Sequence, residues 1–170
     1  MTPIRSGLVA SSRLQVLVKD GVQALKRGDR TFIEEPMRGA FSDSLDIDKA
    51  FEEGHEQENR WDYLLGHRES GKIVGLEPHT ASNKHLATVI KKRAASLRHL
   101  REHLKSGVFV AEWFWVASGK VDFTPMEKAV TRLNENGIRF VGKTFLRKWL
   151  PAGPTAGTKH THARKIKPRP

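Results

Sequence analysis

The sequence WDYLLGH-RESG-KIVGLE, which spans residues 61–77, contains two apolar segments joined by a short polar turn. Both segments are rich in the aliphatic, β-branched and aromatic residues that favour strands. The turn ends in Gly71, a residue type common in the tight turns that connect antiparallel strands. This stretch therefore predicts a β-hairpin, with strands over residues 61–67 and 72–77.

Asp62 and Glu77 are the two acidic residues of the predicted strands, and they are candidates for a functional site. A turn that pairs His67 with Lys72 places Asp62 opposite Glu77 on one face, with about 5 Å between their Cβ atoms. Two carboxylates at that distance repel each other unless a proton, a base or a cation lies between them. A divalent cation such as Mg²⁺ prefers carboxylate oxygens as ligands. There are two alternatives. A register shifted by one residue would place the two carboxylates on opposite faces of the sheet, and a solvated hairpin end would let them lie together at little cost.

Three further residues are candidates for the same site. His79 returns to the face of Glu77 if the strand continues, where imidazole can bind metal, orient water or act as a base. Lys84, at the start of the next predicted helix, could supply a positive charge. Glu58 belongs to an acid-rich predicted helix and is expected to point toward the pair. The alternatives are a surface histidine and a solvated lysine.

The remaining pattern predicts an α/β protein with a mixed sheet of about four to five strands flanked by helices. A helix between the second hairpin strand and the next strand is a crossover, which favours parallel pairing of those two strands. Pro78 is expected to end regular pairing. Helices are predicted over about 12–28, 45–59 and 84–105 and from Thr124, strands over 108–117 and 138–146, and a loop over 29–44. Residues 1–150 are expected to form one domain, and residues 151–170 a flexible basic tail.

The chain is strongly basic, with 30 Lys and Arg against 19 Asp and Glu and a net charge of +11. The charges are segregated: 12 acidic and 5 basic residues lie between Glu34 and Glu77, whereas Asn136 to Pro170 holds 9 basic residues and no acid. An excess of positive charge favours polyanionic partners, above all nucleic acid. An acidic protein partner and a charge that serves only solubility are the alternatives.

Seven basic residues are the candidates for phosphate contact. Three lie on the predicted helix over 84–105, on the face opposite Leu86, Val89, Ile90, Leu97, Leu100 and Leu104. The others lie in the tail, for which an idle extension is the alternative. The candidates are Lys91, Lys92, Arg98, Lys159, Arg164, Lys165 and Lys167.

Other features exclude some functions and leave others open. The chain contains no cysteine, which excludes disulfides, thiolate metal sites and cysteine catalysis. No run approaches the roughly 20 apolar residues of a membrane span, so we expect a cytoplasmic protein without membrane contact. His99 and His103 have the i, i+4 spacing of zinc ligands, but we interpret them as exposed polar positions. The aromatic segment 113–115 is expected to be partly core, with base stacking or a homodimer contact as alternatives.

The pattern resembles the PD-(D/E)XK nuclease superfamily over about residues 45–146. That family places an acidic residue on a helix, Asp on one strand and Glu-x-Lys on the next, followed by a helix and further strands. The matching residues here are Glu58, Asp62 and Glu77. The lysine position is occupied by His79, so either His79 acts in its place, or Lys84 replaces the lysine from the helix, or activity is lost.

The resemblance implies a restriction-endonuclease-like fold and hydrolysis of phosphodiester bonds in DNA or RNA. Mg²⁺ or Mn²⁺ would be held by Asp62, Glu77 and Glu58, and His79 or Lys84 would assist the attacking water. The alternative is a catalytically degenerate protein of this fold that binds nucleic acid or assembles with a protein partner, including a second copy of itself.

Overall fold

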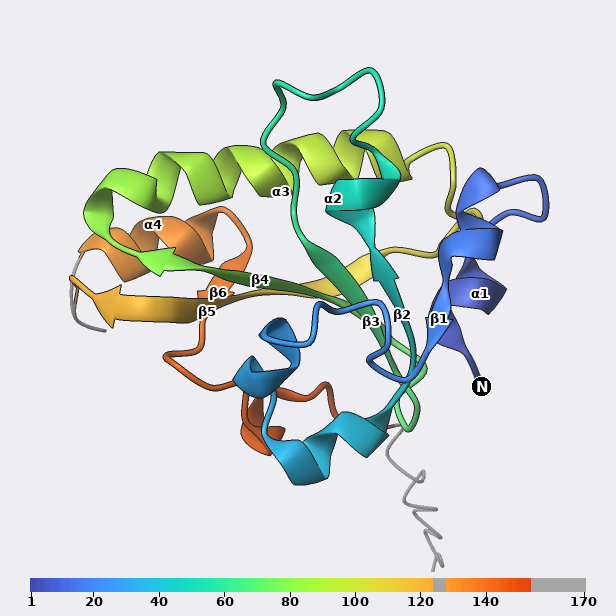
Figure 1. Cartoon of the computed structure of the whole chain (residues 1–170), viewed down its shortest axis with the longest axis horizontal. Coiled ribbons are helices and arrows are strands. Elements are labelled where there is room, and N and C mark those ends of the chain that lie inside the picture. The colour runs from blue at the N-terminus through green and yellow to red at the C-terminus, as the bar shows by residue number, and fades with distance from the viewer. Residues whose placement is uncertain (124–127, 154–170) are drawn as a thin grey trace, which may run out of the picture.

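The computed structural model describes residues 1–123 and 128–153, which form an α/β domain with a mixed sheet (Figure 1). Within these residues the sheet has six strands in the order β1-β2-β3-β4-β5-β6. The strands are β1 (Lys19–Asp20), β2 (Phe41–Asp46), β3 (Tyr63–His67), β4 (Ile73–Ala81), β5 (Val110–Val121) and β6 (Ile138–Phe140). The α-helices are α1 (Pro3–Gly7), α2 (Ile47–Ala50), α3 (Leu86–Leu100) and α4 (Lys128–Glu135). The 3-10 helices are η1 (Arg13–Leu17), η2 (Asp29–Phe32), η3 (Glu35–Ala40), η4 (Asn83–His85) and η5 (Arg147–Trp149).

Strand pairing changes direction at β4. Strands β1 to β4 are antiparallel to their neighbours, whereas β4 pairs with β5, and β5 with β6, in parallel. The connections differ: a tight turn joins the antiparallel strands β3 and β4, whereas α3 carries the chain back across the sheet between β4 and β5, as a parallel pair requires. The mixed sheet flanked by helices is confirmed, with one strand more than the upper expectation of five.

The two faces of the sheet are covered differently (Figure 1). Alternate side chains of a strand point to opposite faces, so Leu64 belongs to the core beneath α3 and Tyr63 to the core on the other side. Val89 and Leu100 of α3 pack into the first core. The second core is closed by η2, η3 and the segment around Phe145. Asp62 and Glu77 share the parity of Leu64 and therefore face α3.

The N-terminal third departs most from the sequence-based expectations. The helix predicted over 12–28 is absent, because Leu17 is exposed and Gly21 adopts a positive φ of 55° that turns the chain. The loop predicted over 29–44 contains the start of β2, whose Asp43 and Ser44 are polar yet fully buried between paired strands.

The helix predicted over 45–59 shrinks to the four residues of α2. Asp46 caps it by accepting the backbone N–H of Lys49, and Ile47, Ala50 and Phe51 bury its apolar side. The acid-rich residues that follow bring no apolar group to the core until Trp61, so the chain continues as turns that rise beside α3 (Figure 1).

The second half of the chain agrees better with expectation, with shifted boundaries. Pairing does not end at Pro78: β4 continues to Ala81 and pairs there with β5 alone, since β3 begins only at Tyr63. Proline is tolerated because the β3 side of the strand is already open. The helix predicted over 84–105 begins at Leu86 and ends at Leu100. Most of the predicted tail, residues 154–170, lies outside the described residues, as does Thr124.

Candidate functional site

The hairpin has the register that brings Asp62 and Glu77 together. Tyr63 pairs with Leu76, and the N–H of His67 donates to the carbonyl of Lys72 over 2.9 Å. Asp62 therefore lies opposite Glu77, one residue before β3 begins. Its backbone N–H donates to Oε2 of Glu77 over 2.9 Å, so the glutamate side chain caps the end of the ladder.

Lys92 of α3 lies between the two carboxylates. Its Nζ is 2.5 Å from Oε1 of Glu77 and 3.2 Å from Oδ1 of Asp62. Glu77 is fully buried, while the side chains of Lys92 and Asp62 retain 13% and 24% of their exposure. We call Asp62, Glu77 and Lys92 the acid–lysine triad. It reaches solvent mainly through Asp62.

Backbone contacts hold the two residues that precede β3 in place under α3. The N–H of Trp61 donates to Oγ of the buried Ser96 over 2.9 Å, one turn beyond Lys92 on the helix. The carbonyl of Asp62 accepts the N–H of Ile47 over 2.9 Å. A Cβ at Gly75 would lie 2.6 Å from the Trp113 ring, so only glycine lets that ring cover the hairpin beside the triad. The triad thus sits on rigid elements of the sheet and helix.

Burial shifts the pKa values of the triad. It raises the pKa of Asp62, and it raises that of Glu77 well above its ordinary value, with the charge of Asp62 adding to the effect on Glu77. Burial alone would lower the pKa of Lys92, but the charges of Glu77 and Asp62 outweigh it and the pKa is raised. Two carboxylates therefore face one persistent ammonium, and full ionisation leaves an excess of negative charge that a proton or a second cation can neutralise.

His79 returns to the face of Glu77, as the extended β4 requires. Its Nδ1 is 3.8 Å from Oε1 of Glu77, and its ring lies 4.9 Å from that of His85. Burial, followed by the charges of Lys92 and His85, lowers the pKa of His79 to about 4. A neutral imidazole with a lone pair is thus available next to the triad near neutral pH.

Two other predicted site residues lie elsewhere. Lys84 is exposed in η4, and within residues 1–123 and 128–153 it takes part in no hydrogen bond or ion pair with the triad. Glu58 does not join Asp62, because the turns after α2 carry it to the far end of α3. There Oε2 of Glu58 is 2.6 Å from Nε2 of His99, and Nη2 of Arg98 is 3.1 Å from both carboxylate oxygens.

Lys92 was predicted to contact nucleic acid from the outer helix face, and this placement is wrong. The buried positions of α3 include Leu86, Val89, Ser96 and Leu100, and Lys92 falls in the same stripe. Leu97, expected in that stripe, is 38% exposed. The signal was present in the sequence: a lysine three residues after Val89 and four before Ser96 interrupts the face that a helix buries.

The other predicted contacts have mixed outcomes. Lys91 and Arg98 are exposed on α3, although Arg98 already pairs with Glu58. His99 is not an exposed polar position, because its side chain is 11% exposed and stacks on Phe51. The aromatic segment of β5 is buried on both faces, which removes it as a base-stacking or homodimer surface. The tail candidates Lys159, Arg164, Lys165 and Lys167 lie outside the described residues.

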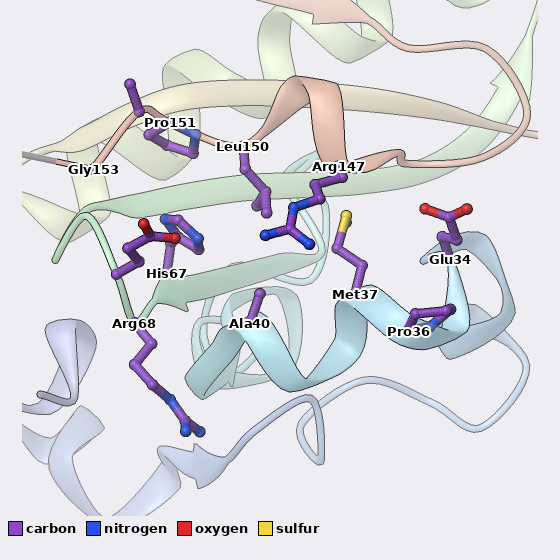
Figure 2. Close-up of a pocket in the computed structure, with 12 residues that line it drawn as sticks. Glu34, Pro36, Met37, Ala40, His67, Arg68, Arg147, Leu150, Pro151 and Gly153 are labelled. Atoms are coloured by element: carbon purple, nitrogen blue, oxygen red, sulfur yellow. The ribbon is translucent and has the colours of Figure 1, made fainter.

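A cavity of about 560 Å³ lies at the opposite end of the hairpin (Figure 2). Its lining includes Met37, His67, Arg68 and Arg147, and no member of the triad. His67 already bonds Ser70 through Nδ1 over 2.7 Å. The volume is sufficient for a small ligand, but among the described residues no ion pair joins the charged groups of its lining, whereas two ion pairs join the triad. The chemistry therefore points to the triad rather than to this cavity.

Comparison with protein-family models, with curated proteins and with solved structures finds no match to this chain. In the part of the chain that the structure describes, no helix has the length and apolar character needed to cross a membrane. Any functional conclusion therefore depends on the geometry of the triad and on its surroundings.

Proposed function

We propose that this protein is a metal-dependent nuclease of the restriction-endonuclease-like type, which hydrolyses phosphodiester bonds in DNA or RNA. The observation that carries the proposal is the position of Lys92 Nζ, 2.5 Å from Glu77 and 3.2 Å from Asp62. Two strand-borne carboxylates and one lysine are the groups of the PD-(D/E)XK pattern, which Asp62 and Glu77 resemble in sequence.

This chain departs from that pattern at the lysine position, and the proposal assigns the role of that lysine to Lys92. The pattern places its lysine two residues after the glutamate, where this chain has His79. Lys92 brings an ammonium to the same carboxylates from α3 instead. This replaces the expectation that Lys84 or His79 alone would substitute, and the order of β3, β4, crossover helix and parallel β5 is compatible with it.

The triad suits a divalent cation by the chemistry of its donors. Asp62, just before β3, and Glu77 of β4 present hard anionic oxygens side by side, and their charge exceeds that of the single ammonium. Mg²⁺ or Mn²⁺ held by these two residues would activate water and stabilise the charge that develops on the phosphate. Glu58 is not part of this ligand set, because it binds His99.

The remaining groups have assignable roles. Lys92 stays protonated, since its pKa is raised, and can hold the attacking water or a phosphate oxygen. His79, neutral because its pKa is lowered to about 4, can accept a proton near Glu77. Lys91 is exposed on the adjacent helix surface and can contact the phosphate backbone.

The test uses the full chain with single- and double-stranded DNA and RNA in Mg²⁺ or Mn²⁺. We expect cleavage that falls at least about 100-fold in Asp62→Asn and in Lys92→Met. Lys72→Met is the matched control, because it removes an exposed lysine at the turn end of the same hairpin, away from the carboxylates. Cleavage that survives in Asp62→Asn, or that is absent in the wild type with every substrate, would overturn the proposal.

A second candidate is a nucleic-acid-binding protein that has lost catalysis. Lys92 favours it, because its ammonium already occupies the space between the carboxylates as a built-in cation. This candidate predicts salt-sensitive binding that chelators and Asp62→Asn leave unchanged. Binding of Mg²⁺, which prefers oxygen ligands, by the wild type but not by Glu77→Gln, measured by calorimetry, would favour the nuclease over this candidate.

A further inference from the structure

We infer that His55, Glu58 and His99 form a second metal site, which takes a first-row transition-metal dication such as Zn²⁺. One nitrogen of each histidine and one carboxylate oxygen of Glu58 lie within 4.8 Å of one another. The three groups come from two segments about 40 residues apart, the turns after α2 and the last turns of α3. This site is independent of the acid–lysine triad and does not rest on the proposed nuclease function.

The donor atoms are already close to a common centre. Oε2 of Glu58 is 2.6 Å from Nε2 of His99, and Oε1 is 3.7 Å from Nδ1 of His55. The two imidazole rings lie 4.4 Å apart. Zinc bound at ~2.0–2.2 Å by a tetrahedral set separates its ligand atoms by ~3.4 Å, so modest side-chain rotation completes the arrangement. Solvent supplies a fourth ligand.

The surroundings hold these side chains in position. The buried guanidinium of Arg60 donates to the carbonyls of His55 and Glu58 and pairs with Asp48, which fixes the loop that carries two of the ligands. Phe51 stacks on the His99 ring at 5.0 Å and orients it. The metal can enter from solvent, since His55 and Glu58 keep 41% and 34% of their side-chain exposure.

The donor set selects the class of metal. Two imidazole nitrogens and one carboxylate suit Zn²⁺ and its first-row neighbours, whereas Mg²⁺ prefers oxygen ligands alone. Arg98 binds both oxygens of Glu58 at 3.1 Å, and a carboxylate has enough lone pairs to keep this contact while it binds a metal. Glu52, Glu53 and Glu56 lie on the same loop and add negative charge that attracts a cation.

The experiment is a titration of the full, chelator-treated chain with Zn²⁺ in competition with a chromophoric chelator. We expect one tight equivalent, and an affinity that falls about 100-fold in His55→Ala and in Glu58→Gln. Visible absorption after loading with Co²⁺ reports nitrogen and oxygen ligands directly. His55 is partly exposed, so its alanine variant should fold, and circular dichroism in chelator verifies this.

Two matched controls separate this site from others. His160→Ala/His162→Ala removes the only histidines outside the described residues and should bind Zn²⁺ as the wild type does. Asp62→Asn alters the triad and should also retain Zn²⁺ affinity, so failure of this inference and of the nuclease proposal are distinguishable. Absence of micromolar binding in the wild type, or unchanged binding in both His55→Ala and Glu58→Gln, would overturn the inference.

Discussion

Two acidic sites lie along the same side of α3, and they differ in depth. Lys92 and His99 are seven residues apart, about two turns or 10 Å. At Lys92 the helix lies over the sheet and Glu77 is fully buried. At His99 it faces a surface loop, and Glu58 keeps 34% of its side-chain exposure. One helix thus organises a buried carboxylate and a half-exposed one.

The depth of each site decides whether the pKa of its glutamate is raised or lowered. Burial, then the charge of Asp62, raises the pKa of Glu77 although Lys92 touches it. The hydrogen bond from His99 lowers the pKa of Glu58. Desolvation acts in the opposite direction on this pKa, but its effect is smaller than that of the hydrogen bond. A partner cation is present in both sites, so the contrast shows that desolvation and not pairing decides the sign at Glu77.

Lys92→Met should produce the largest effect. It leaves Asp62 and Glu77 without their ammonium, and removal of one partner from a buried ion pair costs about 3–5 kcal/mol. Urea unfolding at neutral pH in chelator measures the loss. The triple variant Asp62→Asn/Glu77→Gln/Lys92→Met removes all three charges and should recover most of it. A loss below about 1 kcal/mol for Lys92→Met would mean that the triad is effectively solvated.

Ser96→Ala should cost about 1–3 kcal/mol, because it leaves the buried N–H of Trp61 without an acceptor. The buried end of α3 would then hold Asp62 less firmly, which faster hydrogen exchange at the Trp61 amide should report. Ser118→Ala makes the same chemical change at an exposed position of β5 and should be nearly neutral. Equal stability of the two variants would show that Ser96 does not anchor the triad.

The hairpin could be predicted from the sequence because its determinants are local. Two segments rich in strand-forming residues and a four-residue turn ending in glycine indicate the register that places Asp62 opposite Glu77. Lys92 could not be paired with them from that pattern alone, because the contact joins residues 30 positions apart through the packing of α3. The interruption of the apolar stripe of α3 pointed to it, but a period of 3.6 leaves neighbouring positions ambiguous.

The prediction for the N-terminal third was wrong because tertiary contacts, and not the local pattern, determine its structure. Leu14 and Val18 have helical spacing, but tertiary contacts use them in a 3-10 turn and beside a two-residue strand. Strand β2 has no apolar alternation, since Asp43 and Ser44 are buried by backbone pairing and not by hydrophobicity. The position of Glu58 depended on the length of α2, which the sequence did not determine.

Asp43 extends the comparison to a buried acid that lacks a lysine. Its Oδ2 accepts the N–H of Arg5 over 2.9 Å, and burial raises its pKa. Because the folded state then binds a proton more tightly than the unfolded state, stability falls as pH rises above about 4 and through the raised pKa. Asp43→Asn removes this dependence. The variant should gain on the order of 1 kcal/mol relative to wild type between acidic and neutral pH.

The measurement is urea unfolding of wild type and Asp43→Asn across that pH range. The difference between the two chains cancels the titration of every other group. A difference that stays constant with pH would mean that Asp43 titrates alike in the folded and unfolded states, so that burial does not control it.

Glu58→Gln should have the smallest effect on stability in metal-free protein. Glu58 and its partner Arg98 keep 34% and 59% of their side-chain exposure, and exposed pairs of this kind contribute little and are screened by salt. We expect a smaller loss than for Ser96→Ala, one that disappears in about 1 M NaCl, whereas the Lys92→Met loss should persist there because buried charges are screened much less. Urea unfolding of both variants at low and high salt makes the comparison.

If Glu58→Gln lost as much stability as Lys92→Met and kept that loss in salt, the two ends of α3 would not differ in depth, and the distinction between a buried and a surface acidic site would fail. If instead the loss were small without metal but large with saturating Zn²⁺, the same residue would report metal binding, because only a bound cation would tie the loop to the helix strongly enough to matter.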